Sequence, residues 1–231
     1  MLSKFFFTIR KKMSYTVKKR AQSLRSGGRM TVIIDYGAGN IKSVENALLL
    51  LGEKVRVTNV KSEILSAERV ILPGVGAFGD AMKQLRNSGL DKVIRQVVAK
   101  GIPLLGICLG LQLLFESSEE SPGVSGLGIL KGKVLKIPKQ PGLKIPHMGW
   151  NSLDMKPDSR LFTGLDENTY VYFVHSYYLV AEEERIVKAV THYGTTIHAA
   201  IEAENVFACQ FHPEKSGTVG LQILKNFINV T

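Results

Sequence analysis

Apolar and polar residues follow two different periods along the chain, and the changes of period mark the predicted elements. Short runs of apolar residues predict strands at 31–35, 55–58, 69–72 and 102–107. Between them, apolar residues three and four positions apart predict amphipathic helices at 41–51 and 90–98, and a glycine soon after each helix ends it. Strands and helices in alternation require a parallel sheet that is covered by helices on both faces.

The pattern changes after Glu116. Turn residues interrupt short apolar runs in the middle third of the chain, which predicts hairpins attached to the α/β body. Further strands are predicted at 170–174, 186–190, 197–201 and 206–211. The last predicted helix, 217–230, would bury Leu221, Leu224, Phe227 and Ile228. The predicted fold class is therefore α/β, with a mostly parallel sheet, helices on both of its faces and an attached antiparallel hairpin region.

Composition and charge divide the chain into a body and a basic extension. The net charge is +10, but residues 1–29 hold nine Lys and Arg and no acid, which leaves +1 for residues 30–231. A nearly neutral body gives a nucleic-acid role little support. We predict that residues 1–29 are a disordered extension, or translated sequence before a start at Met30, although their composition superficially fits a transit peptide. Residues 30–231 are predicted to form the single folded domain.

Cysteine usage and hydropathy exclude several classes of protein. Cys108 and Cys209 show no disulfide pattern, which favours a reducing, cytoplasmic compartment. They also lack metal-ligand spacing, so no structural zinc site is expected. No apolar run reaches transmembrane length, so no membrane role is expected.

The candidate chemistry centres on the end of the predicted strand 102–107. Gly106-Ile107-Cys108-Leu109-Gly110 has the spacing of a nucleophile elbow, in which a strained strand-to-helix turn raises the nucleophile above the sheet. A thiol at a helix N-terminus is favoured as the thiolate. A lone cysteine is more often a small buried hydrophobe, but the symmetric glycines favour catalysis here.

A candidate base lies at the end of the last predicted strand, in His212-Pro213-Glu214. In an extended chain the side chains at i and i+2 face the same way, so Glu214 can orient the ring of His212. A histidine held by a carboxylate is the general base that a thiol nucleophile needs. Together with the elbow, the pair predicts a Cys108–His212–Glu214 triad.

Two glycine-rich turns follow other predicted strands. Tyr36-Gly37-Ala38-Gly39-Asn40 lacks the third glycine of a dinucleotide fingerprint, and Asn40 is placed to cap the next helix. The stretch 73–79 lacks the Gly-Lys-Ser/Thr of a phosphate loop. On spacing alone, a plain turn and a set of oxyanion donors are equally good interpretations of it.

These motifs together resemble the class I glutamine amidotransferases, whose nucleophile lies in Gly-x-Cys-x-Gly and whose base pair lies in a C-terminal His-x-Glu. Among them the chain is most similar to the glutaminase subunits of imidazole glycerol phosphate synthase. The similar blocks cover about 200 residues in the right order and include 36–40, 73–76, 106–110, 146–151, 173–177 and 210–216. Leu111 replaces a methionine that is common in the family.

The resemblance implies hydrolysis of glutamine to glutamate and ammonia, without a metal or an organic cofactor. It implies a heterodimer with a (β/α)₈ cyclase subunit, which receives the ammonia and makes imidazole glycerol phosphate in histidine biosynthesis. The residues implied for the oxyanion hole are Gly74, Val75 and Leu109, and those implied for substrate binding are Gln112, Glu116, Ser176 and Tyr177. Gln112 and Glu116 are four positions apart, so we expect them to share a helix face. The alternative interpretation is that this face is an ordinary solvated surface and binds no substrate.

We also expect Asn40, Met148, Trp150 and Lys215 to lie at the partner interface. Pro146 and Gly149 argue against regular structure around Trp150, and Trp and Met are enriched at interfaces. The alternative is that Trp150 fills a small hairpin core. Two other functions stay open: the glutaminase subunit of another amidotransferase, and a non-catalytic regulatory relative.

Overall fold

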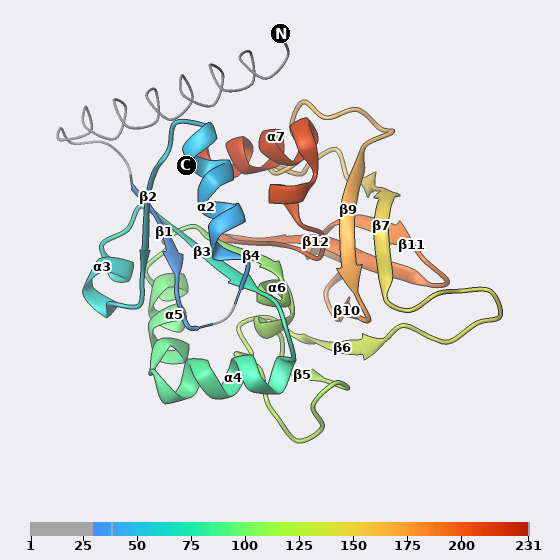
Figure 1. The fold of residues 1–231 in the computed structure, drawn as a ribbon, viewed down its shortest axis with the longest axis horizontal. Coiled ribbons are helices and arrows are strands. Elements are labelled where there is room, and N and C mark those ends of the chain that lie inside the picture. Colours follow the sequence, from blue (N-terminus) through green and yellow to red (C-terminus); the bar gives the residue numbers. More distant parts are fainter. Residues whose placement is uncertain (1–29, 38, 231) are drawn as a thin grey trace, which may run out of the picture.

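An eight-stranded sheet runs through the protein, whose computed structural model describes residues 30–37 and 39–230 (Figure 1). Five neighbouring strands are parallel and the last three are antiparallel. In spatial order they are β2 (Lys54–Thr58), β1 (Met30–Ile34), β3 (Arg69–Gly74), β4 (Leu104–Cys108), β13 (Val206–Cys209), β12 (Thr196–Ala203), β11 (Val187–His192) and β8 (Asp154–Met155). Residues 1–29, with the prediction made for them, lie outside the described residues.

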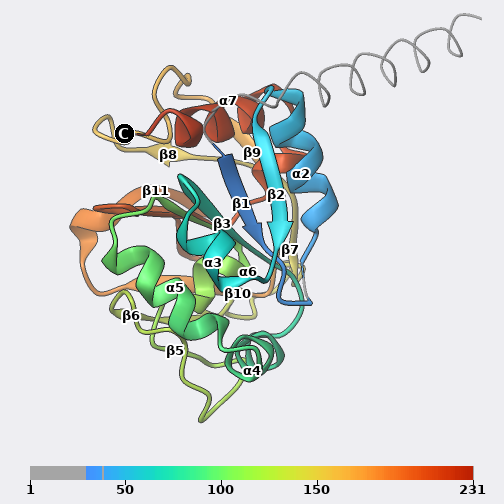
Figure 2. The ribbon, with the colours of Figure 1, turned by 90° about the vertical axis from the view of Figure 1, so that its left-hand side faces the viewer.

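Helices cover both faces of the parallel part of the sheet, because successive strand residues point to opposite sides. Residues such as Val32 and Val70 pack on one face, against α3 (Lys61–Leu65), α4 (Phe78–Asn87) and α5 (Leu90–Ala99). Their neighbours Ile33 and Ile71 pack on the other face, against α2 (Ile41–Leu50) and α7 (Gly217–Ile228). Figure 2 shows the two sets of helices on opposite sides of β1, β2 and β3. The predicted fold class is confirmed.

The attached region consists of two small sheets. In one, β10 (Tyr177–Ala181), β6 (Gly132–Lys136) and β5 (Ser117–Ser118) lie in that order, with β6 antiparallel to β10. In the other, β7 (His147–Ser152) pairs antiparallel with β9 (Tyr170–His175). The attached antiparallel region is confirmed, but β6 and β7 find their antiparallel partners in strands from 170–181 and not in local hairpins. That pairing buries Val134 and Phe173, which local hairpins would leave without a core.

Several element boundaries differ from the prediction. The stretch 73–79 is only partly a turn, since β3 continues to Gly74 and α4 begins at Phe78. A short 3-10 helix, η1 (Glu184–Ile186), precedes β11 where a strand was predicted. The closing helix ends at Ile228, and it buries Ile223 fully while Leu221 and Ile228 are only partly buried. Packing against the sheet selects these residues, because propensity alone does not fix which side of a helix turns inward.

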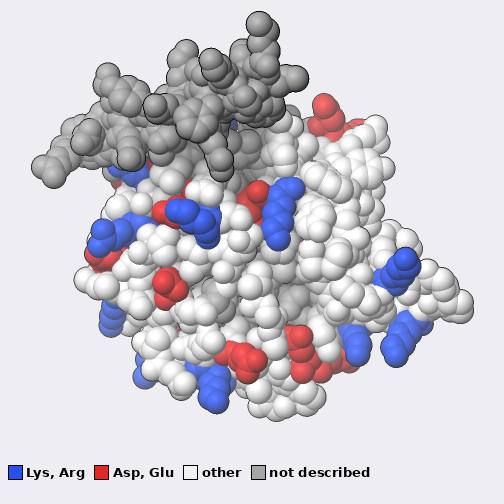
Figure 3. Space-filling view, in the orientation of Figure 1, with Lys and Arg blue, Asp and Glu red and all other residues white. Residues whose placement is uncertain are grey.

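Charged side chains are dispersed over the body. On the face shown in Figure 3, Lys and Arg are interspersed with Asp and Glu and form no continuous basic band over the described residues. Within residues 30–37 and 39–230, no helix is long and apolar enough to cross a membrane.

Candidate active site

Cys108 occupies the corner between β4 and α6 (Leu109–Leu113), as the elbow motif predicted. Its backbone has a φ of 55°, a conformation in which a non-glycine residue is strained. A Cβ on Gly110 would lie 1.9 Å from the carbonyl oxygen of Leu72, and a Cβ on Gly106 would lie 2.9 Å from the carbonyl group of Gly110. Both glycines are therefore required for α6 to pass this close to the sheet. Because α6 has only five residues, its dipole contributes less at the sulfur than the sequence suggested.

The strands on either side of β4 bring the other predicted groups to Cys108. Gly74 lies opposite Cys108 in the β3–β4 register, and Cys209 lies opposite Ile107 in the β13–β4 register. Since the strands are parallel, their carboxyl ends meet at one edge of the sheet. The segment that follows β13 carries His212 to that edge.

His212 and Glu214 form the predicted contact. The Nδ1 atom of His212 lies 2.9 Å from Oε1 of Glu214, and both side chains are buried. The backbone between them is the 3-10 turn η2 (Pro213–Lys215) rather than the extended chain that was assumed. The turn is held by Ser216, whose hydroxyl donates to the carbonyl oxygen of His212 at 2.7 Å. The geometry thus reaches the predicted contact by a different backbone path.

The environment of His212 favours its protonated form. Burial lowers the pKa of His212, but hydrogen bonds and charge interactions with Cys108 and Glu214 outweigh burial and raise the pKa from 6.5 to about 9. Because Glu214 engages Nδ1, the interaction with the sulfur falls on Nε2 of the ring. At neutral pH the ring of His212 therefore carries a proton, on the side that faces the sulfur.

The loop after β3 is tied down at both ends. The Tyr36 hydroxyl donates to the carbonyl oxygen of Pro73 at 3.0 Å, and Oε2 of Glu120 accepts from the backbone N–H of Phe78 at 2.7 Å. Between these ties, Val75 is exposed. Burial and the nearby Cys108 charge raise the pKa of Tyr36 well above its usual value, so its hydroxyl stays neutral. Gly74 thus lies opposite Cys108 in the β3–β4 register, and Val75 follows it in the loop.

The four predicted substrate residues do not all converge. Gln112 is buried, and its Nε2 donates to the carbonyl oxygen of Tyr177 at 3.0 Å. Ser176 and Tyr177 line a groove of about 480 Å³. Glu116 does not share a helix face with Gln112, because α6 ends at Leu113, and its Oε2 instead accepts from the backbone N–H of Gly132 at 3.1 Å. The expectation for Glu116 rested on a longer helix and is wrong in that respect.

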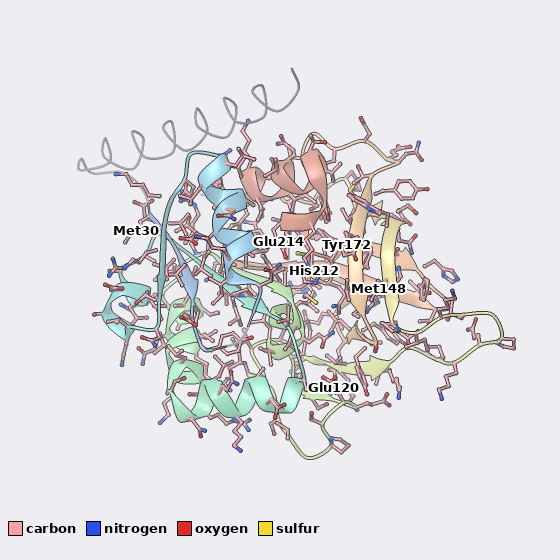
Figure 4. All side chains as sticks on the ribbon, in the orientation of Figure 1. Met30, Glu120, Met148, Tyr172, His212 and Glu214 are labelled. Carbon is pink, nitrogen blue, oxygen red and sulfur yellow. The ribbon has the colours of Figure 1, made fainter. Side chains whose placement is uncertain are left out.

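The predicted interface residues lie at the surface near the triad. Met148 and Trp150 are 62% and 56% exposed, on β7, and Trp150 pairs in register with Tyr172 of β9. Figure 4 labels Met148, Tyr172, His212 and Glu214 on the same side of the molecule. The carbonyl oxygen of Tyr172 accepts from the backbone N–H of His212 at 2.9 Å, and the Lys215 ammonium lies 6.0 Å from the centroid of the Tyr172 ring. The residues around Trp150 form a strand, which corrects the expectation of irregular structure: Pro146 precedes the strand, so its missing N–H interrupts no ladder.

Asn40 stands at the N-cap of α2, but its side chain does not cap the helix as predicted. Its Oδ1 accepts from the Ser43 hydroxyl at 2.8 Å, and its backbone carbonyl accepts from the N–H groups of Ser43 and Val44. It is partly exposed.

Sequence reasoning missed several residues of the site. Gln210 is fully buried, and its Nε2 lies 3.7 Å from the Cys108 sulfur. Nδ1 of His175 donates to the carbonyl oxygen of Tyr177 at 2.9 Å. Gln210 and His175 belong to motif blocks noted in the sequence, but only the strand order shows that both approach the nucleophile. Tyr36 also stands in such a block, 36–40, whereas Glu120 carried no signal beyond its type. Among the described residues, no cluster of three His, Cys, Asp or Glu is placed to hold a metal ion.

Comparison with known proteins agrees with this geometry. The family profile described as "Glutamine amidotransferase class-I" matches residues 32–230. Proteins named imidazole glycerol phosphate synthase subunit HisH are similar to the chain. The one from Moorella thermoacetica is 52% identical over 199 residues, which are 86% of this chain and 94% of that protein. The one from Methanocaldococcus jannaschii is 49% identical over 201 residues, which are 87% of this chain and 100% of that protein.

Solved structures share the fold at lower identity. The structure of PurLQS from Thermotoga maritima matches with a TM-score of 0.70 at 21% identity, over 88% of this chain and 99% of that one. A structure described as glutamine amidotransferase matches with a TM-score of 0.66 at 20% identity, over 87% of this chain and 97% of that one. With the profile spanning nearly the whole body and the relatives about half identical, the chain belongs to the class-I glutamine amidotransferase family.

Proposed function

We propose that the protein hydrolyses glutamine to glutamate and ammonia through Cys108, His212 and Glu214, and that it passes the ammonia to the cyclase subunit of imidazole glycerol phosphate synthase. The observation that carries the proposal is the strained Cys108 corner with the buried His212–Glu214 pair at the same sheet edge. The relatives named as subunits of that synthase support the specific pathway, histidine biosynthesis.

The first half of the reaction forms a thioester. The Cys108 thiolate attacks the side-chain amide carbon of glutamine, and the resulting oxyanion receives hydrogen bonds from backbone N–H groups of Leu109 and of Gly74 or Val75. Collapse of this intermediate breaks the C–N bond, and His212 gives its proton to the departing nitrogen, which leaves as ammonia. The proton is available because His212 is protonated at neutral pH.

The second half restores the enzyme. The ring of His212, now neutral, takes a proton from a water molecule that attacks the thioester carbon. The C–S bond then breaks, glutamate leaves, and the thiolate and the protonated ring are regenerated. Glu214 keeps Nδ1 of His212 engaged throughout, so Nε2 always faces the sulfur. None of these steps uses a cofactor.

Glutamine would bind beside Cys108, whose sulfur lies 3.8 Å from the carbonyl oxygen of Val174, two residues before Ser176. Both hydrogens of the Gln112 amide nitrogen are already committed, to the carbonyl oxygen of Tyr177 and to Oε1 of Gln210. A substrate contact by Gln112 would therefore use its own carbonyl oxygen, which accepts from the substrate's ammonium or amide group.

The cyclase would dock on the surface formed by Asn40, Met148, Trp150 and Lys215. Met148 and Trp150 are exposed, and Met and Trp are enriched at the centres of protein interfaces. Lys215 follows Glu214 directly and would pair with an acidic residue of the partner. Free Cys108 and Cys209 suit a reducing, cytoplasmic site for this heterodimer.

The test is synthesis from two nitrogen sources. With the cyclase present, Cys108→Ala should abolish glutamine-dependent synthesis and leave synthesis from ammonium salts nearly intact, because only the nucleophile is lost. Equal loss with both sources would contradict the proposal. Wild-type protein that releases no glutamate, with the cyclase and its ligand present, would indicate a non-catalytic relative.

A further inference from the structure

A buried chain of hydrogen bonds connects strand β7 with the nucleophile. It begins at Asn151, whose Nδ2 lies 3.3 Å from Nε2 of His147, and His147 Nδ1 lies 3.0 Å from Nε2 of His175. His175 Nδ1 lies 2.9 Å from the carbonyl oxygen of Tyr177. That oxygen is therefore the point at which this arm of the chain ends.

A second arm runs from the same carbonyl to the sulfur. Gln112 Nε2 donates to the Tyr177 oxygen at 3.0 Å and to Oε1 of Gln210 at 2.9 Å. Gln210 Nε2 then lies 3.7 Å from the Sγ atom of Cys108, within reach of a hydrogen bond to sulfur. The amide of Gln210 is thus the last link before the nucleophile.

The Tyr177 carbonyl fixes the direction of both arms, because it can only accept. His175 must carry its hydrogen on Nδ1, so its Nε2 accepts and His147 must donate from Nδ1. In the other arm Gln112 must present its nitrogen to the carbonyl. Because the Gln112 nitrogen is a donor, the atom that it contacts on Gln210 must be the acceptor Oε1. The other end of that amide, Nε2, therefore faces the sulfur.

Burial keeps the two histidines in the neutral state that this pattern needs. Burial lowers the pKa of His147 to about 4 and is the main cause that lowers the pKa of His175 to about 3. The His147 ring is stacked between Phe173 and Tyr193, with centroid distances of 4.7 and 3.9 Å. Each ring therefore has one donor, one acceptor and a fixed orientation.

We propose that Gln210 is a positioning residue for the Cys108 sulfur. The Tyr177 carbonyl, held in place by the arm from Asn151 to His175, fixes through Gln112 which end of the Gln210 amide faces the sulfur. An N–H directed at the sulfur stabilises the thiolate, whereas an amide oxygen in that place would repel it. The inference deepens the proposed function, since it rests on Cys108 as the nucleophile.

The test measures thiolate formation directly, without glutamine. In the full chain, the rate at which iodoacetamide alkylates Cys108 is followed against pH, with the site of alkylation checked by peptide mass because Cys209 is also free. The titratable groups around the sulfur are His212, Glu214, Tyr36, Cys209 and, beyond them, His175. Substitution of Gln210 changes none of them.

Gln210→Met keeps the side-chain volume and removes the N–H, so we expect the alkylation midpoint to rise by about half to one pH unit. Gln210→Glu keeps the shape and places a carboxylate beside the sulfur, which should raise the midpoint further. In the complex, Gln210→Met should lower kcat about tenfold while KM changes less than about threefold, because the ground-state contacts of glutamine remain.

Asn205→Leu is the matched control. Asn205 is a partly buried amide just before the same strand, β13, and donates to the carbonyl oxygens of Val98 and Ile102 at the opposite edge of the sheet. The Asn205→Leu substitution should lower the melting temperature without moving the pH midpoint of Cys108 alkylation. A midpoint that stays unchanged in Gln210→Met, or moves equally in Asn205→Leu, would overturn the inference.

A second pair tests the histidine arm. His147→Phe preserves the stacked ring and removes the donor to His175, which loosens the His175 ring that holds the Tyr177 carbonyl. The midpoint should therefore rise by less than in Gln210→Met but in the same direction. His198→Phe, on β12, removes only an acceptor for the backbone N–H of Ala181 and should have no effect. Equal midpoints in wild type and His147→Phe would overturn the role of the arm. The alkylation midpoints do not depend on glutamine hydrolysis. If the glutaminase assay fails, they therefore still test whether Gln210 positions the sulfur.

Discussion

At the scale of single residues, the charge state of His212 follows from its two neighbours. The ring is buried, which by itself disfavours a positive charge, yet Cys108 and Glu214 supply enough interaction to reverse that effect. The arrangement gives one residue two consecutive tasks, first as an acid toward the leaving ammonia and then as a base toward water. The same interactions also stabilise the fold, and this makes them measurable without substrate.

We predict a pH-dependent stability contribution from His212. A group whose pKa rises from 6.5 to about 9 on folding stabilises the folded state fully below pH 6.5, and the contribution, ~3 kcal/mol at most, disappears as the pH rises through 9. Urea unfolding of the full chain and of His212→Gln between pH 6 and pH 10 measures it. The free energy of unfolding of the wild type should fall more steeply above pH 7 than that of the variant. Parallel curves would contradict the prediction.

At the scale of elements, the β7–β9 pair separates a buried face from an exposed one. Phe173 of β9 is fully buried beneath the pair, whereas Trp150 of β7 is 56% exposed. The Trp150 and Tyr172 rings pack edge to face, with their centroids 6.1 Å apart. The pair therefore presents large apolar side chains to solvent although it has a complete core behind it. This arrangement fits docking better than core packing.

We predict that Trp150→Ala weakens binding of the cyclase, or its stimulation of glutamine hydrolysis, and lowers the free energy of unfolding of the isolated subunit by less than ~1 kcal/mol. Titration of glutaminase activity with the partner, beside a melting curve, measures both. Phe173→Ala is the control and should cost ~3–5 kcal/mol of stability, because it leaves a cavity in the core. Normal stimulation with a much lower melting temperature in Trp150→Ala would show that Trp150 is only a core residue.

At the scale of the whole molecule, the two large cores on either face of the sheet draw their described residues from position 32 onward. We predict that deletion of residues 1–29 changes the melting temperature by less than ~3 °C and leaves partner-dependent activity intact. An acid-free basic run with few core-type residues gains too little burial to offset its ordering entropy. A fall of ~10 °C would show instead that the apolar residues among the first nine dock on the body.

The sequence by itself determined the features that depend on near neighbours. The elbow at Cys108, the contact between His212 and Glu214 and the alternation of strands and helices each involve residues a few positions apart, whose relation local geometry fixes. Local reasoning failed where an element was shorter or more regular than assumed, as at Glu116, beyond the end of α6, and at Trp150, inside a strand. There the decisive partner lay elsewhere in the chain.

Only the tertiary structure decided which distant residues meet. Gln210 bonds to Gln112, 98 positions away, and approaches Cys108, 102 positions away, because β13 lies beside β4 in the sheet. β6 likewise has its antiparallel partner, β10, more than 40 positions farther along the chain. Hydrophobic periodicity specifies which face of an element is buried but not which element lies beside it. The order of the strands is set by the packing of both cores at once, and that order places the polar network behind the nucleophile.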